Sequence, residues 1–246
     1  MLRAILSPLR TLIALLSLLV TTLALGSYLI VLLWIRPDTR QVTPTMRLWA
    51  HVFLWTTGAR VTVEGLERID PNASYVFTGN HLSNIDVPVM VGRLPVSVRF
   101  LAKKELFKVP ILGRAMRAID MVVTDRGAGT GMHRVVNRQV ATVVEKGLSL
   151  VIYPEGTRSR DAEMRPFKKG AFRIAIDNAM AVVPVTIAGS ERVWKPGSPL
   201  IMGGRVRLVI HEPIPTEGMT TADIDGLRDR VRGVVEAQYE EIRANR

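Results

Sequence analysis

Residues 74–93, SYVFTGNHLSNIDVPVMVGR, predict the fold of this chain more directly than any other stretch. The run Ser74–Gly79 is typical of a buried strand, and Asp86 followed closely by Pro88 is typical of a helix N-terminus. A strand that leads through a short turn into a helix is the building block of a layered α/β domain. The stretch therefore predicts a strand, a turn that carries His81, and a helix that begins at Asp86.

The same alternation continues along the chain. Seven segments of strand length are predicted at 60–63, 74–79, 97–102, 121–124, 148–153, 182–188 and 206–211. Helical patterns lie at 87–93, 111–118, 132–146 and 171–179, and a closing C-terminal helix has one apolar face formed by Ile224, Leu227, Val231, Val234, Val235 and Tyr239. We therefore expect the fold class to be α/β, with a mixed sheet of about seven strands flanked by helices.

The N-terminal part of the chain has a different character. Residues 11–35 form an uncharged, leucine-rich run of 25 residues, which is longer than the roughly 20 that a helix needs to cross a bilayer. Residues 43–57 are amphipathic and carry Trp49 and Trp55, as helices at a membrane interface often do. We therefore expect residues 1–58 to form membrane-anchoring helices.

A signal peptide is the main alternative for the first apolar run, because Ala24-Leu25-Gly26 resembles a cleavage site. Against this alternative, the apolar run continues for nine residues beyond Gly26. The sequence leaves open whether the segment spans the bilayer or folds back at Gly26-Ser27, and positive charges flank both of its ends. The remaining residues, 59–246, are expected to form one α/β domain.

The composition excludes several kinds of chemistry. The chain contains no cysteine, which excludes disulfides, thiolate metal sites and an acyl-cysteine intermediate. It also lacks the Gly-x-Ser-x-Gly elbow that is typical of many serine hydrolases. The formal net charge of +11 predicts an anionic partner, which could be nucleic acid, an anionic lipid surface or a phosphorylated substrate.

His81 and Asp86 are the first candidates for chemistry. Histidine is the natural general base near neutral pH, and a carboxylate can hold its ring in the useful tautomer. On one continuous helix, side chains five residues apart would point about 140° away from each other. The two residues can therefore cooperate only if His81 lies on the turn before the helix. The alternative is a helix-capping aspartate beside an unrelated turn histidine.

A second candidate cluster is Tyr153-Pro154-Glu155-Gly156-Thr157-Arg158-Ser159, which directly follows the apolar run 148–152. A glycine in such a loop lets a ligand approach the backbone, and Arg158 offers a planar fork that suits phosphate. Phe167-Lys168-Lys169-Gly170 adds two cations before the next helix. The alternative is a turn with a solvated arginine.

Together these motifs resemble the glycerolipid acyltransferases of the His-x4-Asp type, and most closely the 1-acylglycerol-3-phosphate O-acyltransferases. The resemblance covers roughly residues 60–215. It rests on five segments in the expected order, at 81–86, 102–113, 123–126, 153–159 and 183–185. One position departs from the family pattern, because Asp120 stands where a glycine is usual.

The resemblance implies a membrane-bound enzyme of phospholipid biosynthesis, with residues 59–246 as its catalytic domain. Such an enzyme transfers a fatty acyl group from an acyl thioester to the 2-hydroxyl of lysophosphatidic acid and produces phosphatidic acid. The donor would be acyl-CoA or an acyl carrier protein, with no cofactor, no metal and no nucleic acid. Its catalytic domain would face the cytoplasm.

The residues can be given roles in this reaction. His81 would take the proton of the acceptor hydroxyl, and Asp86 would bind the other ring nitrogen. The acceptor's phosphate would be held by Arg158 in a loop shaped by Glu155, Gly156 and Thr157. Arg126 is a second phosphate ligand by resemblance, whereas Lys104 is a candidate by charge alone and could equally be a solvated lysine.

Several alternatives remain open. Within the same class, the acceptor could be glycerol 3-phosphate or another lyso-lipid. A membrane-tethered basic module that binds nucleic acid is less favoured, because aromatic residues make up only 6% of the chain. A metal site at His81 and Asp86 lacks the further ligands that it would need. His51, His133 and His211 have no motif partner, and we expect surface or packing roles for them.

Overall fold

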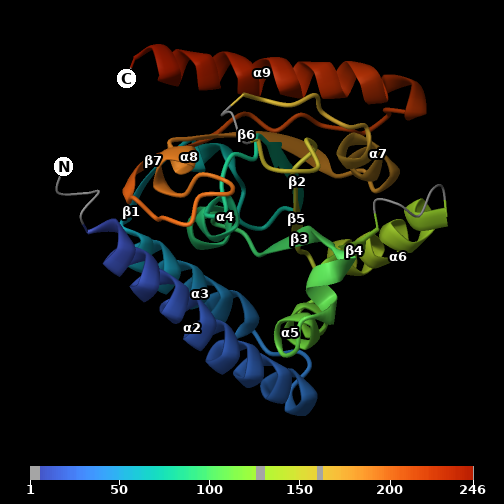
Figure 1. Ribbon diagram of the computed structural model, residues 1–246. Helices are drawn as coiled ribbons and strands as arrows, with labels where there is room; N and C mark the ends of the chain where they lie inside the picture. The colour runs from blue at the N-terminus through green and yellow to red at the C-terminus, as the bar shows by residue number, and fades with distance from the viewer. Residues whose placement is uncertain (1–5, 126–130, 160–162, 246) are drawn as a thin grey trace.

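A seven-stranded sheet with the order β1-β7-β6-β2-β5-β3-β4 forms the centre of the protein (Figure 1). The computed structural model describes residues 6–125, 131–159 and 163–245. The strands are, in chain order, β1 (Ala59–Glu64), β2 (Tyr75–Gly79), β3 (Val98–Lys103), β4 (Val122–Thr124), β5 (Ser149–Ile152), β6 (Ala181–Ala188) and β7 (Gly204–Ile210). Each strand begins and ends within two residues of the segment predicted from the sequence.

The sheet is mixed, as predicted. The neighbouring strands from β6 to β4 run parallel, whereas β7 is antiparallel to β6 and β1 is parallel to β7. The parallel strands follow one another through helices, because a parallel return requires a crossover connection. The chain leaves β6 through the short helix α8 (Ser190–Val193) and a loop, and β7 returns beside β6 in the opposite direction.

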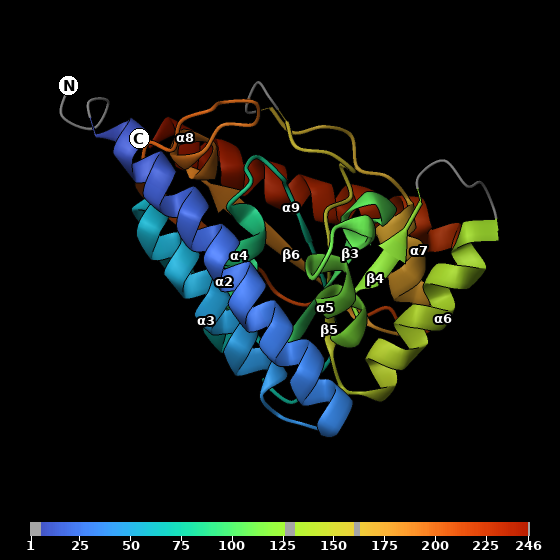
Figure 2. The same cartoon turned by 60° about the horizontal axis from the view of Figure 1, so that its bottom comes forward.

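Helices cover both faces of the sheet (Figures 1 and 2). α4 (Asp86–Arg93) and α5 (Leu112–Ala118) lie on one side. α6 (Gly131–Glu145), α7 (Gly170–Asp177) and α9 (Ile224–Ala244) lie on the other side. This split follows from the right-handed crossovers, because the chain first moves along the sheet from β2 to β4 and then back to β5 and β6.

The central strands are apolar on both faces because both faces are covered. In β2, Phe77 belongs to the core on the side of α4, and Val76 belongs to the core beneath α7 and α9. In β5, Val151 and Leu150 divide in the same way. Successive side chains of a strand point to opposite faces, so one short apolar run supplies both cores.

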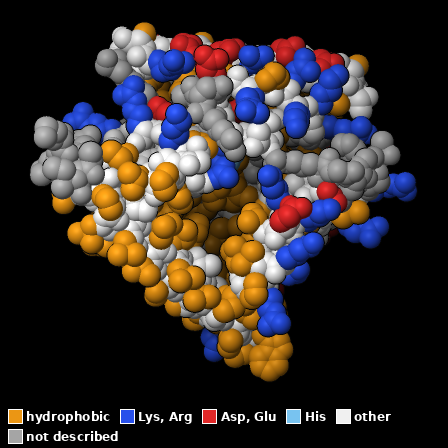
Figure 3. Space-filling view, in the orientation of Figure 1, with side chains coloured by type: hydrophobic (Ala, Val, Ile, Leu, Met, Phe, Trp, Pro, Cys, Tyr) orange, Lys and Arg blue, Asp and Glu red, His pale blue; other side chains and the backbone are white. Residues whose placement is uncertain are grey.

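The two N-terminal helices pack against each other beside α4 and α5 (Figure 2). α2 (Ser7–Ile35) is continuous through Gly26, and α3 (Val42–Thr57) follows it. Polar contacts join the pair, including the Trp49 Nε1–H that donates to Thr22 Oγ1 at 3.0 Å. α2 is long and apolar enough to cross a membrane, and only 11% of an apolar stretch of 18 of its residues is buried inside the protein. Figure 3 shows the resulting apolar surface along the lower left of the molecule.

α9 closes the opposite side and has the character of an ordinary amphipathic helix. Leu227, Val231, Val235 and Tyr239 are buried against the sheet. Charged side chains cover its outer surface, at the top of Figure 3. The regular spacing of its apolar residues predicts this face, except at Val234, which is only partly buried.

Candidate active site

The end of β2 is fixed tightly to β6. A Cβ on Gly79 would lie only 2.0 Å from Val185 O, so no larger residue fits there without a shift of the backbone. Asn80 follows, and its side-chain amide continues the pairing beyond the strand: Oδ1 accepts from Ile187 N at 2.8 Å and Nδ2 donates to Ile187 O at 2.7 Å. These two residues set the position of the turn that carries His81.

His81 and Asp86 meet across this turn. His81 Nδ1 lies 2.8 Å from Asp86 Oδ2, and Asp86 is the first residue of α4. The same carboxylate oxygen accepts the backbone N–H groups of Leu82 and Ser83, each at 2.8 Å. Because this oxygen already accepts from two backbone N–H groups, we assign the ring proton to Nδ1 as a third donor, which leaves the lone pair on Nε2. The structure thus has the arrangement that the five-residue spacing requires.

The two groups of the pair differ in exposure. The Asp86 side chain is fully buried, whereas the His81 side chain is 16% exposed. The ring of Tyr153 stacks on the imidazole, with centroids 4.0 Å apart and planes 9° from parallel. Burial raises the pKa of the Tyr153 hydroxyl well above its usual value, and the hydroxyl therefore stays neutral. The stack and the aspartate together hold the plane of the imidazole.

Glu155 holds the backbone of the same turn. Its buried carboxylate accepts from His81 N at 2.8 Å and from Arg165 N at 3.1 Å. Ser159 N donates to His81 O at 3.0 Å, so the loop is hydrogen-bonded to both the backbone N–H and the carbonyl of His81. Burial raises the pKa of Glu155 to about 7, and the two backbone donors oppose that rise. The predicted loop-shaping role fits this geometry, because Glu155 supports the turn and does not line the cavity.

A cavity of about 1450 Å³ opens beside His81. Its long walls are apolar and come from α2, α3, α4, α5 and the sheet, including Leu18, Leu23, Met46, Val91, Met116 and Ile119. Figure 3 shows the hollow bordered by hydrophobic side chains. His81, Thr157, Arg158 and Lys168 line the cavity as well, and so do Lys103, Glu105 and Asp125. Such a cavity suits a molecule with a long apolar part and an anionic headgroup.

The other predicted binding residues are not equally placed. Gly156, Thr157 and Arg158 line the cavity, and Thr157 and Arg158 are exposed. Lys104 lies outside the lining, and its ammonium group is paired with Asp125, whose carboxylate raises the pKa of the lysine. Arg126 lies outside the described residues.

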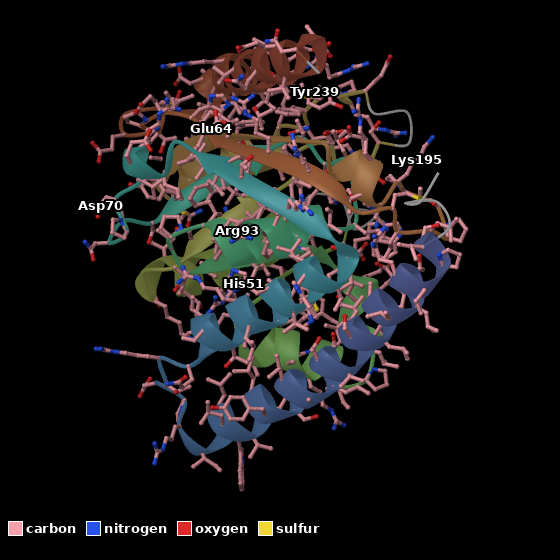
Figure 4. The ribbon with its side chains drawn as sticks, turned by 90° about the vertical axis from the view of Figure 1, so that its left-hand side faces the viewer. His51, Glu64, Asp70, Arg93, Lys195 and Tyr239 are labelled. Atoms are coloured by element: carbon pink, nitrogen blue, oxygen red, sulfur yellow. The ribbon has the colours of Figure 1, made fainter. Side chains whose placement is uncertain are left out.

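The remaining histidines lack a carboxylate partner of this kind where their side chains are described. His51 is exposed on α3, on the opposite side of the sheet from Tyr239 of α9 (Figure 4). The Nε2 atom of His211 lies 2.9 Å from Thr186 Oγ1. Burial and the nearby charge of Arg68 lower the pKa of His211 to about 4. The side chain of His133 lies outside the described part of the chain.

No group of three or more His, Cys, Asp or Glu side chains is placed to hold a metal ion within residues 6–125, 131–159 and 163–245. At His81 and Asp86 the carboxylate oxygen nearest the ring already accepts from three N–H donors. The described residues around this pair therefore do not supply the three or more protein ligands that a metal centre needs.

Asp120, the departure from the family pattern, adopts a left-handed backbone with a φ of 60°. Such a conformation favours glycine, which explains the usual residue at this position. Here the carboxylate has two electrostatic roles: it pairs with Lys146 at 2.7 Å, and its charge opposes the effect of burial, which lowers the pKa of Arg99 to about 10. The backbone turn is thus retained with a different residue.

Asn80 and Tyr153 contribute to the site, although neither was assigned a role from the sequence, where Tyr153 was only the first residue of the second candidate cluster. Each is adjacent to a motif residue, Asn80 to His81 and Tyr153 to the loop of Glu155. Their position beside or within a motif was the only feature of the sequence that pointed to a role for them. Their contacts cross between β2, β5 and β6, and only the order of the strands reveals them.

Comparison with known proteins gives a consistent result. Residues 60–188 match the sequence model of the acyltransferase family. The chain is 29% identical to the 1-acyl-sn-glycerol-3-phosphate acyltransferase of Cocos nucifera over 87% of this chain and 69% of the relative. It is 30% identical to the human 1-acyl-sn-glycerol-3-phosphate acyltransferase alpha over 80% of this chain and 70% of the relative.

A solved structure is similar over nearly the whole chain. The crystal structure of the 1-acyl-sn-glycerophosphate (LPA) acyltransferase from Thermotoga maritima matches with a TM-score of 0.82 and 27% sequence identity. The match covers 98% of each chain. The likeness therefore includes the N-terminal helices as well as the sheet.

Proposed function

The chain belongs to the acyltransferase family, and we propose that it transfers a fatty acyl group from an acyl thioester to the 2-hydroxyl of 1-acylglycerol 3-phosphate (lysophosphatidic acid). The product is phosphatidic acid. The names of the similar proteins support this substrate. The observation that carries the proposal is the 2.8 Å contact between His81 Nδ1 and Asp86 Oδ2, at the wall of an apolar cavity that also holds Arg158.

The proton steps follow from the orientation of the imidazole. Nε2 of His81 takes the proton of the 2-hydroxyl as the oxygen attacks the thioester carbonyl. Asp86 stabilises the imidazolium that forms, because its carboxylate already contacts Nδ1. When the tetrahedral intermediate collapses, the C–S bond breaks and the thiolate leaves with the proton from Nε2. The imidazole is then neutral again, and the ester bond has replaced the thioester bond.

Arg158 is the residue that we assign to the acceptor's phosphate. It is exposed at the polar part of the cavity, two residues from the glycine at position 156. A guanidinium forms paired, charge-assisted hydrogen bonds with phosphate. We do not assign Lys104 a main role in binding the phosphate, because its ammonium is paired with Asp125. Arg126 remains a phosphate ligand by resemblance.

The donor and the surroundings complete the proposal. The acyl group would come from acyl-CoA or an acyl carrier protein, and the residues of the chain perform every step without a cofactor or metal. The exposed apolar side chains of α2 support a position in the membrane, with the cavity open to lipid-borne substrate (Figure 3). We place the catalytic domain on the cytoplasmic side, where the thioester donors are made.

An acceptor panel tests this function. The purified full chain in detergent–lipid micelles is given a labelled acyl thioester with lysophosphatidic acid, glycerol 3-phosphate, a lysophosphodiester or monoacylglycerol, each in buffer with and without a chelator. We expect lysophosphatidic acid to be the preferred acceptor and the chelator to have no effect. If the protein prefers glycerol 3-phosphate or another lyso-lipid, then that molecule is the acceptor and lysophosphatidic acid is not. The absence of transfer to any of them, together with binding to nucleic acid, would favour a basic binding module instead.

A further inference from the structure

Lys168 is a cation on the cavity wall that the roles described above do not use. Its side chain lines the same cavity as His81 and Arg158. Its Nζ atom lies 3.1 Å from the place where a Cβ on Gly156 would be, and its Cε and Cδ atoms lie at 3.4 and 3.5 Å from it. The side chain thus runs along the face of Gly156, where a Cβ would crowd the end of the lysine.

The backbone fixes this position. Lys168 N donates to Pro154 O at 2.9 Å, which ties the residue to the loop of Glu155 and Arg158. Gly156 has a φ of +76°, so a side chain there would be strained as well as crowded by the lysine. The loop therefore holds the side chain of Lys168 against Gly156, which is two residues from Arg158 in the chain.

The next residue provides a natural contrast. Lys169 is 60% exposed and its Nζ lies 2.8 Å from Asp225 Oδ2, at the start of α9. Among the described residues, no carboxylate is paired with Lys168. Both lysines are exposed, but they differ in their surroundings: Lys169 is paired with a carboxylate, whereas Lys168 lines the cavity.

We propose that Lys168 and Arg158 together bind the phosphate of the acceptor, and that Lys168 makes the site select a phosphomonoester over a phosphodiester. This inference rests on the proposed function. A phosphomonoester carries a charge of about −1.5 to −2 at pH 7, whereas a phosphodiester carries a single negative charge. The two positive charges of Arg158 and Lys168 balance the charge of a phosphomonoester and exceed that of a phosphodiester. Arg158 supplies a directional fork and Lys168 supplies a compact charge, so the second contact depends on charge more than on geometry.

The experiment compares four forms of the full chain: the native protein, Lys168→Gln, Lys168→Arg and Lys169→Gln. Glutamine removes the charge but keeps a stem that can lie along Gly156. Each form is assayed with lysophosphatidic acid and with lysophosphatidylglycerol of the same acyl chain, at a fixed mole fraction in neutral micelles. The readouts are kcat and KM for each acceptor and the ratio of the two kcat/KM values. Thermal unfolding of each form checks that the fold is retained.

For Lys168→Gln we expect kcat/KM with lysophosphatidic acid to fall about 10- to 100-fold, as for the loss of one hydrogen bond to a charged group. The loss should be mainly in KM, and the preference over lysophosphatidylglycerol should fall nearly as much. Lys168→Arg should retain most of the preference, and Lys169→Gln should behave as the native chain.

A Lys168→Gln enzyme that keeps its native preference would overturn the inference, and so would one that loses activity equally toward both acceptors. A folded Lys168→Arg enzyme that loses the preference would also overturn it, because the charge is kept. The native protein tests the proposed function separately. If it uses lysophosphatidylglycerol as well as lysophosphatidic acid, the acceptor assignment itself is wrong, and the role of Lys168 falls with it.

Discussion

His81 and His211 each lie just beyond the end of a strand, and each is hydrogen-bonded through one ring nitrogen. His81 follows β2, contacts the carboxylate of Asp86 at 2.8 Å and lines the large cavity. His211 follows β7, contacts the hydroxyl of Thr186 at 2.9 Å and lies near the charge of Arg68. A carboxylate stabilises an imidazolium, whereas a hydroxyl and a neighbouring cation do not. The pKa of His211, lowered to about 4, keeps that ring neutral in its packed position.

The comparison also shows that neighbours in sequence are poor guides to partners in space. Glu212 is adjacent to His211 in the chain, yet its carboxylate pairs with Arg68 at 3.1 Å. Asp86 is five residues from His81 and is its partner. The turn after β2 folds the chain back onto the start of α4, and this geometry brings the pair together. A general base needs a supporting carboxylate and access to substrate. Of the two histidines, only His81 has both.

The largest expected effect separates the two histidines directly. General-base catalysis typically contributes ~10²–10⁴-fold, so His81→Ala should lower turnover by at least ~10²-fold. His211→Gln should keep near-native turnover, because the glutamine amide can still contact Thr186 and His211 does not line the cavity. The measurement is the initial rate with lysophosphatidic acid, alongside circular dichroism of both variants. A His81→Ala enzyme at near-native rate would contradict the comparison.

Asp86→Asn tests the partner that distinguishes the two sites. An amide cannot stabilise the imidazolium and can favour the wrong ring tautomer, so we expect a loss of ~10²-fold or more in kcat with little change in KM. Thr186→Val, at the other histidine, is the matched control and should leave kcat within a few-fold of native. Single-turnover rates measure the chemical step. Equal and small losses in both variants would remove the distinction.

Arg158→Ala should have the next largest effect, a loss of about 10- to 100-fold in kcat/KM with phosphate-bearing acceptors. Arg158→Lys should recover part of it, because a point charge lacks the fork. Arg165→Ala is the control: its side chain is exposed and is not part of the cavity lining. Steady-state kinetics with lysophosphatidic acid and monoacylglycerol decide the point. If Arg158→Ala lowers the rate equally with both acceptors, the phosphate assignment fails.

The regions around the two histidines also differ in their outer helices. α2 borders the cavity of His81 and exposes Leu12, Leu16 and Val20, each at least 51% accessible and none in the cavity lining. Changing all three to serine should weaken binding to lipid vesicles by at least about tenfold, because each apolar side chain is worth ~1.5 kcal/mol or more when buried. Activity toward substrate in detergent micelles should stay within a few-fold of native.

The control for this triple variant is on α9. Arg230 and Ala237 are exposed there, and changing both to serine should leave vesicle binding unchanged. Co-sedimentation with vesicles of neutral lipid measures both variants. Native sedimentation of the α2 variant would show that this surface does not bind the membrane.

The smallest expected effect concerns stability at His211. Its pKa is lowered from 6.5 to about 4 in the folded protein, so the unfolded chain binds the proton more readily between these values. The stabilisation is complete above pH 6.5 and is lost as the pH falls towards 4. We expect a loss of about 1–2 kcal/mol in unfolding free energy, less than the full shift implies, because the ring is only partly buried. Denaturant unfolding of native and His211→Gln protein measures it, and the variant should lack this component.

The sequence predicted the sheet well for a physical reason. The central strands are covered on both faces, so they stand out as short apolar runs such as Leu148–Tyr153 between polar helices. The pairing of β7 antiparallel to β6 was beyond such patterns, because a strand's composition does not record its neighbour. The continuity of α2 through Gly26 was likewise undecided by the sequence and depends on packing against α3 and α5.

The candidate site divides in a similar way. The spacing of His81 and Asp86 predicted only that the two can meet if His81 lies on the turn before the helix, and the resemblance favoured the pair over a helix-capping aspartate; the structure has the contact. The hydrogen bond from the backbone N–H of His81 to Glu155 could not be predicted, since it requires β2 and β5 to be neighbours in the sheet. The pairing of Lys104 with Asp125 depends in the same way on β3 lying beside β4.

The most direct test of the central claim is a double-mutant cycle at His81 and Asp86. Single-turnover rates of acyl transfer to lysophosphatidic acid are measured for His81→Ala, Asp86→Asn and the double variant, each checked for its fold. If Asp86 acts through the imidazole, the double variant should be no more than a few-fold slower than His81→Ala alone. Losses that multiply in the double variant would show two independent contributions and would contradict the account of His81 as a base supported by Asp86.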